Sequence, residues 1–470
     1  MILRWILTVF MWSAFAFTII HFLAIGFWSL LSLRLLARER PANRMVPRSS
    51  APTMDDPPGV SIILPAYNEE AVITYSSGNA LAQDYANLEV IVVNDGSKDN
   101  TAQVMFDAYD MELVEESPQS TPIETEEIFG IYRSRRDERL WFIDKAPAGA
   151  KADNANVGIN LASHPWVVIM DADEFMETDA ITRCMVEIMA APDDVIGVGT
   201  TLLPANDIVI DGSHIVQREA SRNYWVGCQL IEYLTAFIIS RPGMAHMGAL
   251  PIISGGFGLY RREALLTIGG YDKHHIGEDM DLCIRLHRYH LERDIPYRIV
   301  QAPEAIIWTE FPGDRKILKR QRMRWHRGLR QIVGDNGQYI PRRKYGNFGR
   351  FGIGTLYFFE WWGPLIEGAG WFVMGGLLLL GWVNLTNAIA MLVATQLIGQ
   401  VIAVLSVAVA VSTFGFYSQP SDLKRMLWWA VCMNWGFRQQ SLWWRLRSIL
   451  PGDTSWGEMP RAGFKTANST

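Results

Sequence analysis

The chain has 470 residues, more than one ordinary hydrophobic core can organise, so two or three structural units are expected. Its 43 basic and 49 acidic residues give a net charge of −6, and basic residues gather only locally, which excludes a general nucleic-acid binder. The four cysteines lack the spacing of a metal site or a disulfide framework, so we expect reduced core thiols.

The N-terminal segment predicts a membrane anchor over residues 1–36. From Trp5 to Leu33 the only side chain that can carry a charge is His21, and this stretch is long enough to cross roughly 30 Å of hydrocarbon. It is longer than the apolar part of a secretory signal, so we expect it to remain uncleaved. Arginines follow this segment and only Arg4 precedes it, which places the N-terminus outside and the next residues in the cytoplasm. A Pro-rich linker is expected over 37–58.

Residues 59–312 alternate short apolar runs with helical patterns, which predicts an α/β unit with a mostly parallel sheet. Residues 115–139 are charged and are expected to form a surface excursion, and 221–240 a long amphipathic helix. Strands are expected at 60–65, 88–93, 140–144, 167–170, 196–203 and 206–210.

Asp171 and Asp173 follow one of these strands, at the edge of the sheet where α/β proteins bind ligands. One residue apart on an extended chain, both can approach one divalent cation, or one can reach a cation and the other a sugar hydroxyl. An acidic turn after a core strand is the alternative. Their neighbour Glu174 is interpreted as a surface residue.

The C-terminal part is expected to associate with a membrane. Residues 313–350 begin with a basic amphipathic pattern typical of a helix on an anionic lipid surface. Two spans, 355–383 and 388–416, predict a hairpin over 351–416, and 417–470 an interfacial or re-entrant helix, with a fourth pass as the alternative, and a cytoplasmic tail. Glu360 and Glu367 share a face of the first of these spans, where an acid is either functional or paired within the bundle.

Five short motifs occur in the order seen in membrane-embedded family 2 glycosyltransferases, the group of cellulose, hyaluronan and bacterial poly-N-acetylglucosamine synthases. The chain resembles this group over about residues 59–330. The resemblance implies a GT-A fold, a Rossmann-like sheet that binds a nucleotide sugar. The motifs are Asn94-Asp95-Gly96-Ser97, Lys151-Ala152-Asp153-Asn154, Asp171-Ala172-Asp173, Gly277-Glu278-Asp279 and Gln321-Arg322-Met323-Arg324-Trp325.

The resemblance also implies roles on the donor side. Asp95, with Tyr67 and Glu69, would bind the uridine, and Lys151 would approach the phosphates as a point charge. Asp173 would hold Mg²⁺ or Mn²⁺ against the diphosphate, with Asp171 beside it binding the donor and the ion.

On the acceptor side, Asp279 is the implied base for one inverting displacement, with Glu278 shaping its environment; simple helix capping by these acids is the alternative. Arg324 would bind the diphosphate, while Gln321 would meet the acceptor and Trp325 would stack on an acceptor sugar. Gly255 and Gly256 would let backbone approach the acceptor, with an ordinary turn as the alternative.

We therefore expect a UDP-sugar-dependent enzyme, with N-acetylglucosamine as the favoured sugar, that extends a β-linked polysaccharide at the cytoplasmic face of a bacterial inner membrane. So few spans do not easily enclose a pore, so a small membrane partner or a homo-oligomer would serve secretion. Addition of one sugar to a membrane lipid is the alternative. An inactive nucleotide-binding scaffold would be marked by loss of Asp173, Asp279 or Trp325, and all three are present.

Overall fold

The computed structural model describes residues 1–38, 57–115, 121–212, 214–417, 419–451 and 465–466, so the linker expected at 37–58 lies almost entirely outside the described residues. The chain divides into two compact units. We call the first the sheet unit; it comprises Glu39–Glu219, Leu250–Phe311 and Met459–Thr470. We call the second the helical unit; it comprises Met1–Arg38, Ala220–Ala249 and Pro312–Glu458.

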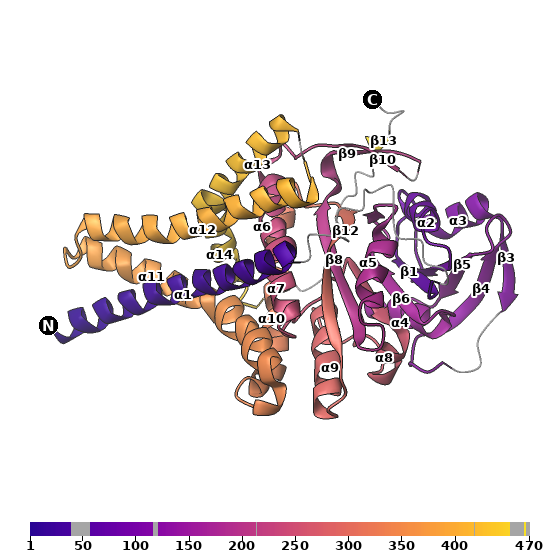
Figure 1. The fold of residues 1–470 in the computed structure, drawn as a ribbon, viewed down its shortest axis with the longest axis horizontal. Coiled ribbons are helices and arrows are strands. Elements are labelled where there is room, and N and C mark those ends of the chain that lie inside the picture. Colours follow the sequence, from indigo (N-terminus) through magenta and orange to yellow (C-terminus); the bar gives the residue numbers. More distant parts are fainter. Residues whose placement is uncertain (39–56, 116–120, 213, 418, 452–464, 467–470) are drawn as a thin grey trace. The chain divides into compact units, whose positions relative to one another are not determined.

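The sheet unit is built on a ten-stranded sheet, counted over the described residues, in the order β3-β4-β5-β2-β1-β6-β11-β8-β12-β7 (Figure 1). Runs of Val, Ile and Leu form its central strands, which are buried along their whole length. The strands are β1 (Val60–Ala66), β2 (Leu88–Asn94), β3 (Met111–Glu115), β4 (Ile128–Ser134), β5 (Leu140–Lys145), β6 (Trp166–Met170), β7 (Phe175–Met176), β8 (Val195–Pro204), β11 (Phe257–Arg261) and β12 (Arg298–Thr309).

Strands β5, β2, β1 and β6 are parallel neighbours, as expected, and they direct their carboxyl ends to one edge. The rest of the sheet is mixed: β11 pairs antiparallel with both β6 and β8, while β8 and β12 are parallel. The antiparallel β11 begins at the edge where β6 ends, because Phe257 pairs with Met170. The chain just before β11 therefore adjoins the two aspartates that follow β6.

Helices of the sheet unit connect these strands. Helix α4 begins at Lys151, and its Gly158 packs so closely on Ile63 of β1 that no side chain would fit. The helices are α2 (Ile73–Leu81), α3 (Thr101–Tyr109), α4 (Lys151–Leu161), α5 (Ala180–Met189), α8 (Arg262–Thr267) and α9 (Glu278–Glu292), and a small second sheet contains β9 (Ile208–Asp211), β10 (His214–Arg218) and β13 (Lys465–Thr466).

The expected surface excursion at 115–139 is wrong over part of its length. Strand β4 lies within it and pairs with β3 and β5, and its Ile128 and Ile131 are buried. Charged residues occupy the exposed positions of this edge hairpin, for example Arg135 paired with Glu112, and these charges conceal the strand pattern.

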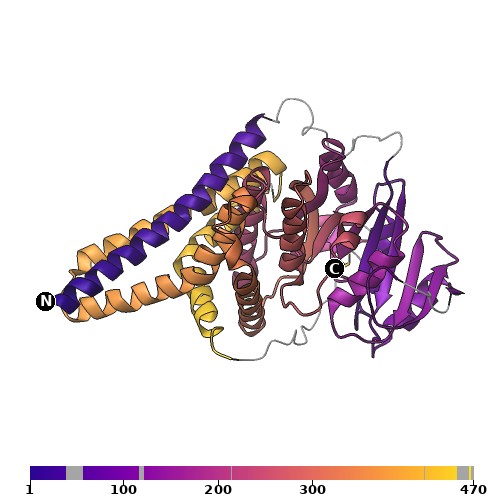
Figure 2. The same cartoon turned by 90° about the horizontal axis from the view of Figure 1, so that it is seen from below.

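The helical unit contains a long N-terminal helix that runs alongside α11 and α12 in both views (Figures 1 and 2). The expected helix at 221–240 forms as α6, which continues through a π-helical turn at Thr235–Ser240 into α7. The helices are α1 (Ile2–Arg38), α6 (Tyr224–Leu234), α7 (Arg241–His246), α10 (Arg315–Asn336), α11 (Trp362–Leu379), α12 (Leu385–Phe414), α13 (Pro420–Cys432) and α14 (Arg438–Arg447).

Two helices of the described residues, Ile2–Ala37 and Leu385–Phe414, are long and apolar enough to cross a membrane. The span expected at 355–383 is divided between π-helical turns at Phe348–Ile353 and Leu356–Trp361 and the shorter α11. The expected C-terminal helix is interrupted at Trp435 and Gly436, which have non-helical backbone angles. These two apolar helices fit association with a membrane, and the number of passes stays a prediction.

Glu360 and Glu367, the two acids expected within a membrane span, are both paired with arginines of α14. Glu367 accepts two hydrogen bonds from Arg438, at 2.8 and 2.7 Å, and Glu360 pairs with Arg445 at 2.8 Å. Pairing within the bundle therefore accounts for both acids. The cysteines are free thiols, as expected, and Cys432 alone among them is half-buried rather than buried.

Candidate active site

The loops after β1 and β2 are tied together and present the residues expected to bind uridine. The Asn68 amide donates to Ser97 Oγ at 3.0 Å, and the Glu69 amide donates to Thr101 Oγ1 at 2.8 Å. Tyr67 is 47% exposed, so its ring is open to a ligand, whereas Glu69 is buried.

Asp95 is buried at the end of β2 and is fixed by three donors. Its Oδ1 accepts from Lys145 Nζ at 2.7 Å and from the Ala148 amide at 2.8 Å, while Oδ2 accepts from the Gly149 amide at 3.1 Å. Lys145 is fully buried and also pairs with Asp153 at 3.0 Å. One buried lysine therefore links the Asp95 motif to the helix that carries Lys151.

Asp171, at the end of β6, forms an ion pair with Lys151. Burial opposes the charge on Lys151, but the carboxylates of Asp171 and Glu278 outweigh it and raise the pKa of the ammonium above its usual value. Lys151 therefore keeps its positive charge at neutral pH. Asp173 is partly exposed two residues further along.

The Gly255-Gly256 segment connects both halves of this site. The Gly256 carbonyl accepts from the Asp171 amide at 3.0 Å, and the Gly255 carbonyl accepts from Lys151 Nζ. The Gly255 amide donates to Asp279 Oδ2 at 2.8 Å. Two glycines thus place the donor-side residues and the expected base around one stretch of backbone.

Asp279 lies in the first turn of α9, together with Glu278. Its Oδ1 accepts from the Met280 amide at 2.8 Å, so a backbone donor orients each of the two carboxylate oxygens. A carboxylate of this kind can accept a proton from a hydroxyl. A position at the start of the helix is compatible with a role of Asp279 as a base, because the first turn of α9 holds its carboxylate in place.

The expectation that Glu174 lies on the surface is wrong, because its residue exposure is only 2%. Its carboxyl packs beneath Gly256, where a Cβ would lie 2.0 Å from Glu174 Oε1. Burial and the nearby Asp171 carboxylate raise the pKa of Glu174 well above its usual value. Glu174 therefore supports the glycine segment as a buried acid.

Asp171 and Asp173 supply only oxygen atoms, which suits a hard divalent ion such as Mg²⁺ or Mn²⁺. The ammonium of Lys151 already neutralises part of the charge on Asp171. The donor set fits such an ion, provided that the ion competes with this ammonium.

Gln321, Arg324 and Trp325 lie on α10 of the helical unit, so their meeting with the sheet-unit residues stays a prediction. Arg324 is buried, whereas Trp325 is 39% exposed and the Arg322 guanidinium lies 4.9 Å from its ring centre. The Trp325 face therefore already has a cationic neighbour on its own helix.

Sequence reasoning missed Lys145 and the support from Glu174. Lys145 ends β5, where an unremarkable strand-end lysine is expected, and only the position of this strand beside β2 shows that its ammonium meets Asp95. Glu174 directly follows the aspartate pair, but a turn from Asp171 to Glu174 redirects its side chain inward.

Comparison with known proteins identifies similar chains. The family model described as "Glycosyltransferase like family 2" matches residues 57–328. A poly-beta-1,6-N-acetyl-D-glucosamine synthase of Staphylococcus epidermidis is 26% identical over 296 residues, 63% of this chain and 60% of that protein. One of Staphylococcus aureus strain COL is 28% identical over 280 residues, 60% of this chain and 57% of that protein. The chain thus matches these relatives over about 60% of their length.

Among solved structures, a mannosyltransferase from Pyrobaculum calidifontis, in complex with GDP-Man and Mn²⁺, superposes with a TM-score of 0.52. The match covers 91% of this chain and 99% of that one at 18% sequence identity. A likeness at this level of identity concerns the fold, which is that of a GT-A glycosyltransferase.

Proposed function

Because the chain belongs to glycosyltransferase family 2, we propose that it transfers N-acetylglucosamine from UDP-N-acetylglucosamine to a hydroxyl of a growing β-linked polysaccharide, at the cytoplasmic face of the inner membrane. The observation that supports this most is the Gly255 backbone, which bonds Lys151 through its carbonyl and Asp279 through its amide. The names of the staphylococcal relatives support the choice of sugar.

On the donor side, Asp95 and the exposed ring of Tyr67 bind the uridine, with Glu69 buried beside them. Lys151 approaches the diphosphate, and Arg324 adds a fork of donors from α10. A Mg²⁺ or Mn²⁺ ion held by Asp173 and Asp171 would supply charge neutralisation for the departing UDP. The positive charges of Lys151 and Arg324 lower the cost of breaking the bond between the anomeric carbon and the phosphate oxygen.

On the acceptor side, Asp279 takes the proton of the acceptor hydroxyl as its oxygen attacks the anomeric carbon. The hydroxyl attacks from the face opposite UDP, so the configuration inverts. The bond to UDP breaks with its electron pair leaving on the phosphate, and the proton passes later from Asp279 to water. Glu278 shapes the field around Lys151, and Gln321 and Trp325 hold the acceptor sugar. The Gly255-Gly256 segment gives the acceptor access, because it carries no side chains.

The test is a transfer assay on the purified full-length protein in detergent, with labelled UDP-N-acetylglucosamine and Mg²⁺ or Mn²⁺. A ladder of polysaccharide products is expected. A single glycolipid product would instead establish the alternative, addition of one sugar to a lipid, and release of no UDP with any UDP-sugar would reject the enzymatic proposal. For secretion we propose a small membrane partner or a homo-oligomer, which co-purification would identify.

A further inference from the structure

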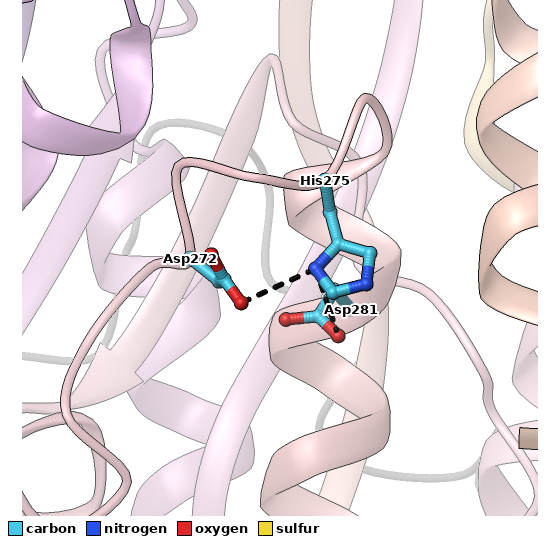
Figure 3. Close-up of side chains that lie close together, drawn as sticks. All are labelled: Asp272, His275 and Asp281. Carbon is cyan, nitrogen blue, oxygen red and sulfur yellow. Dashed lines mark ion pairs between the residues drawn. The ribbon is translucent and has the colours of Figure 1, made fainter. Parts of the chain in front are cut away.

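A second cluster of metal-ligating side chains lies in the sheet unit, apart from Asp171 and Asp173 in the sequence. Asp272 and His275 come from the segment that precedes α9, and Asp281 lies in the first turn of that helix (Figure 3). One potential ligand atom from each of the three residues lies within 4.8 Å of the other two. The proposed transfer reaction uses none of them.

The two distances from His275 to the carboxylates are close to those that a bound ion imposes, and the two carboxylate oxygens lie within 4.8 Å of each other. His275 Nδ1 lies 3.3 Å from Asp272 Oδ2 and 3.7 Å from Asp281 Oδ1. Ligands at the usual 2.0–2.2 Å from a tetrahedral ion are about 3.3–3.6 Å apart. A small inward movement would therefore let all three contact one ion.

The carboxylates are oriented by neighbours that leave the inward oxygens for a ligand. Asp272 Oδ1 accepts from the His274 amide at 2.8 Å, and Asp281 Oδ2 accepts from Arg285 Nε at 2.6 Å. The opposite oxygen of each carboxylate faces the imidazole. Fixing one oxygen of a carboxylate so that the other can bind is the usual arrangement around protein-bound metals.

The cluster is closed on one side and open on the other. The side chain of Asp281 is 6% exposed and that of His275 is 16% exposed, whereas that of Asp272 is 35% exposed. An ion could therefore enter from the solvent side, where Asp272 is the most exposed of the three residues.

We propose that Asp272, His275 and Asp281 form a second divalent-cation site, which takes a transition-metal ion such as Zn²⁺ or Mn²⁺. One imidazole nitrogen and two carboxylate oxygens suit these ions, whereas Mg²⁺ prefers an all-oxygen shell. The ion joins the segment before α9 to the first turn of that helix. Asp281 is two residues from Asp279, so the site stabilises the helix start that positions the proposed base.

The experiment measures binding of the metal alone to the full-length protein in detergent, after chelator treatment and without nucleotide or acceptor. Equilibrium dialysis with ZnCl₂ and MnCl₂ should show one metal ion bound per wild-type chain. In His275→Ala the dissociation constant of this ion should rise by at least about 100-fold, which is more than the usual effect of changing a residue that only orients a ligand. His274→Ala, a change at the adjacent exposed histidine, is the matched control and should bind as the wild type does.

Two further measurements separate this site from the donor site and from a folding defect. The double variant Asp171→Asn/Asp173→Asn should still bind this one metal ion per chain. Zn²⁺ should slow amide hydrogen exchange at residues 272–281 in the wild type but not in His275→Gln. Equal ion binding by wild type and His275→Ala, or no ion bound by the wild type, would overturn the proposal and leave His275 as an ion-pair partner. Neither result depends on whether sugar transfer occurs.

Discussion

At the scale of single residues, Asp279 has the clearest expected effect. Asp279→Asn keeps a side-chain oxygen that can accept the hydrogen bond of the Gly255 amide, but it removes the negative charge that accepts a proton. We expect kcat/KM to fall by about 10²–10⁴-fold while UDP affinity stays nearly unchanged, measured by transfer kinetics and calorimetry. Glu292→Gln, at the other end of α9, is the control. Full transfer by Asp279→Asn would reject this residue as the base.

Lys145 makes a different prediction, because it is fully buried between Asp95 and Asp153. Lys145→Met leaves two buried carboxylates without their cation, and loss of one partner of a buried pair costs about 3–5 kcal/mol of unfolding free energy. Lys273→Met is the control, because the exposed Lys273 pairs loosely with Glu126 at 3.8 Å and should change stability by less than about 1 kcal/mol. Chemical unfolding of both variants checks the difference, and equal stabilities would contradict it.

At the scale of elements, the glycine segment before β11 depends on the buried Glu174. A Cβ on Gly256 would overlap its carboxyl, so Gly256→Ala should cost about 1–3 kcal/mol of unfolding free energy and lower transfer activity. Adding Glu174→Ala should recover part of that loss, a coupling of about 1 kcal/mol in a double-mutant cycle. Gly334→Ala, where nothing lies within 4 Å, is the control. Strictly additive effects would show that the two residues do not meet.

Helix α9, which carries Asp279, is attached to its neighbours by a neutral histidine. His287 Nε2 lies 2.8 Å from the Leu250 carbonyl and Nδ1 lies 2.6 Å from Tyr297 Oη, and burial lowers the pKa of His287 to about 3. The unfolded chain binds this proton near pH 6.5, so the contribution of His287 is complete above that pH and declines as the pH falls towards 3. No loss is expected above pH 6.5.

We therefore expect α9 to lose up to about 1.4 kcal/mol of protection per pH unit between pH 6 and pH 4 through this residue alone. Amide hydrogen exchange of α9, corrected for intrinsic rates, measures this slope. His287→Gln should flatten it, whereas the change His214→Gln at an exposed position should not. An unchanged slope in His287→Gln would assign the acid sensitivity to other groups.

The parallel core and the aspartates at its edge were predictable because apolar runs followed by polar turns repeat along the chain. Strands β8 and β9 were expected as well, at 196–203 and 206–210, whereas β11 and β12 were not. Strand β11 directly follows Gly255-Gly256, for which a turn was the alternative, and β12 contains Pro303 and a register shift between Ala302 and Ile306 that breaks its alternation. Lys145 and Glu174 act through neighbours that the fold supplies, so no local spacing reveals them.

At the scale of the whole molecule, the N-terminal end of α1 lies beside the turn between α11 and α12. Arg4 Nη2 donates to the Trp382 carbonyl at 3.4 Å, and its guanidinium lies 5.9 Å from the Trp382 ring. Contact between these two ends is compatible with both lying on the same side of the membrane. The charge asymmetry of the sequence predicts that this side is the outside.

We expect a membrane-impermeant maleimide to label Leu3→Cys and Asn387→Cys in intact cells, and Lys319→Cys on α10 only after the cells are opened. The wild type is the control for the native thiols, of which Cys432 alone is half-buried rather than buried. Labelling of Lys319→Cys in intact cells would reverse the predicted orientation.

The ion pair between Lys151 and Asp171 has a consequence for the order in which ligands bind. Without a donor, the ammonium compensates the carboxylate, so a free cation gains little by arriving alone. A nucleotide diphosphate gives Lys151 another anion and releases Asp171, and thermodynamic reciprocity requires the cation to strengthen nucleotide binding by the same factor. The two ligands should therefore bind cooperatively, and a cell low in nucleotide sugar would leave this site largely free of metal.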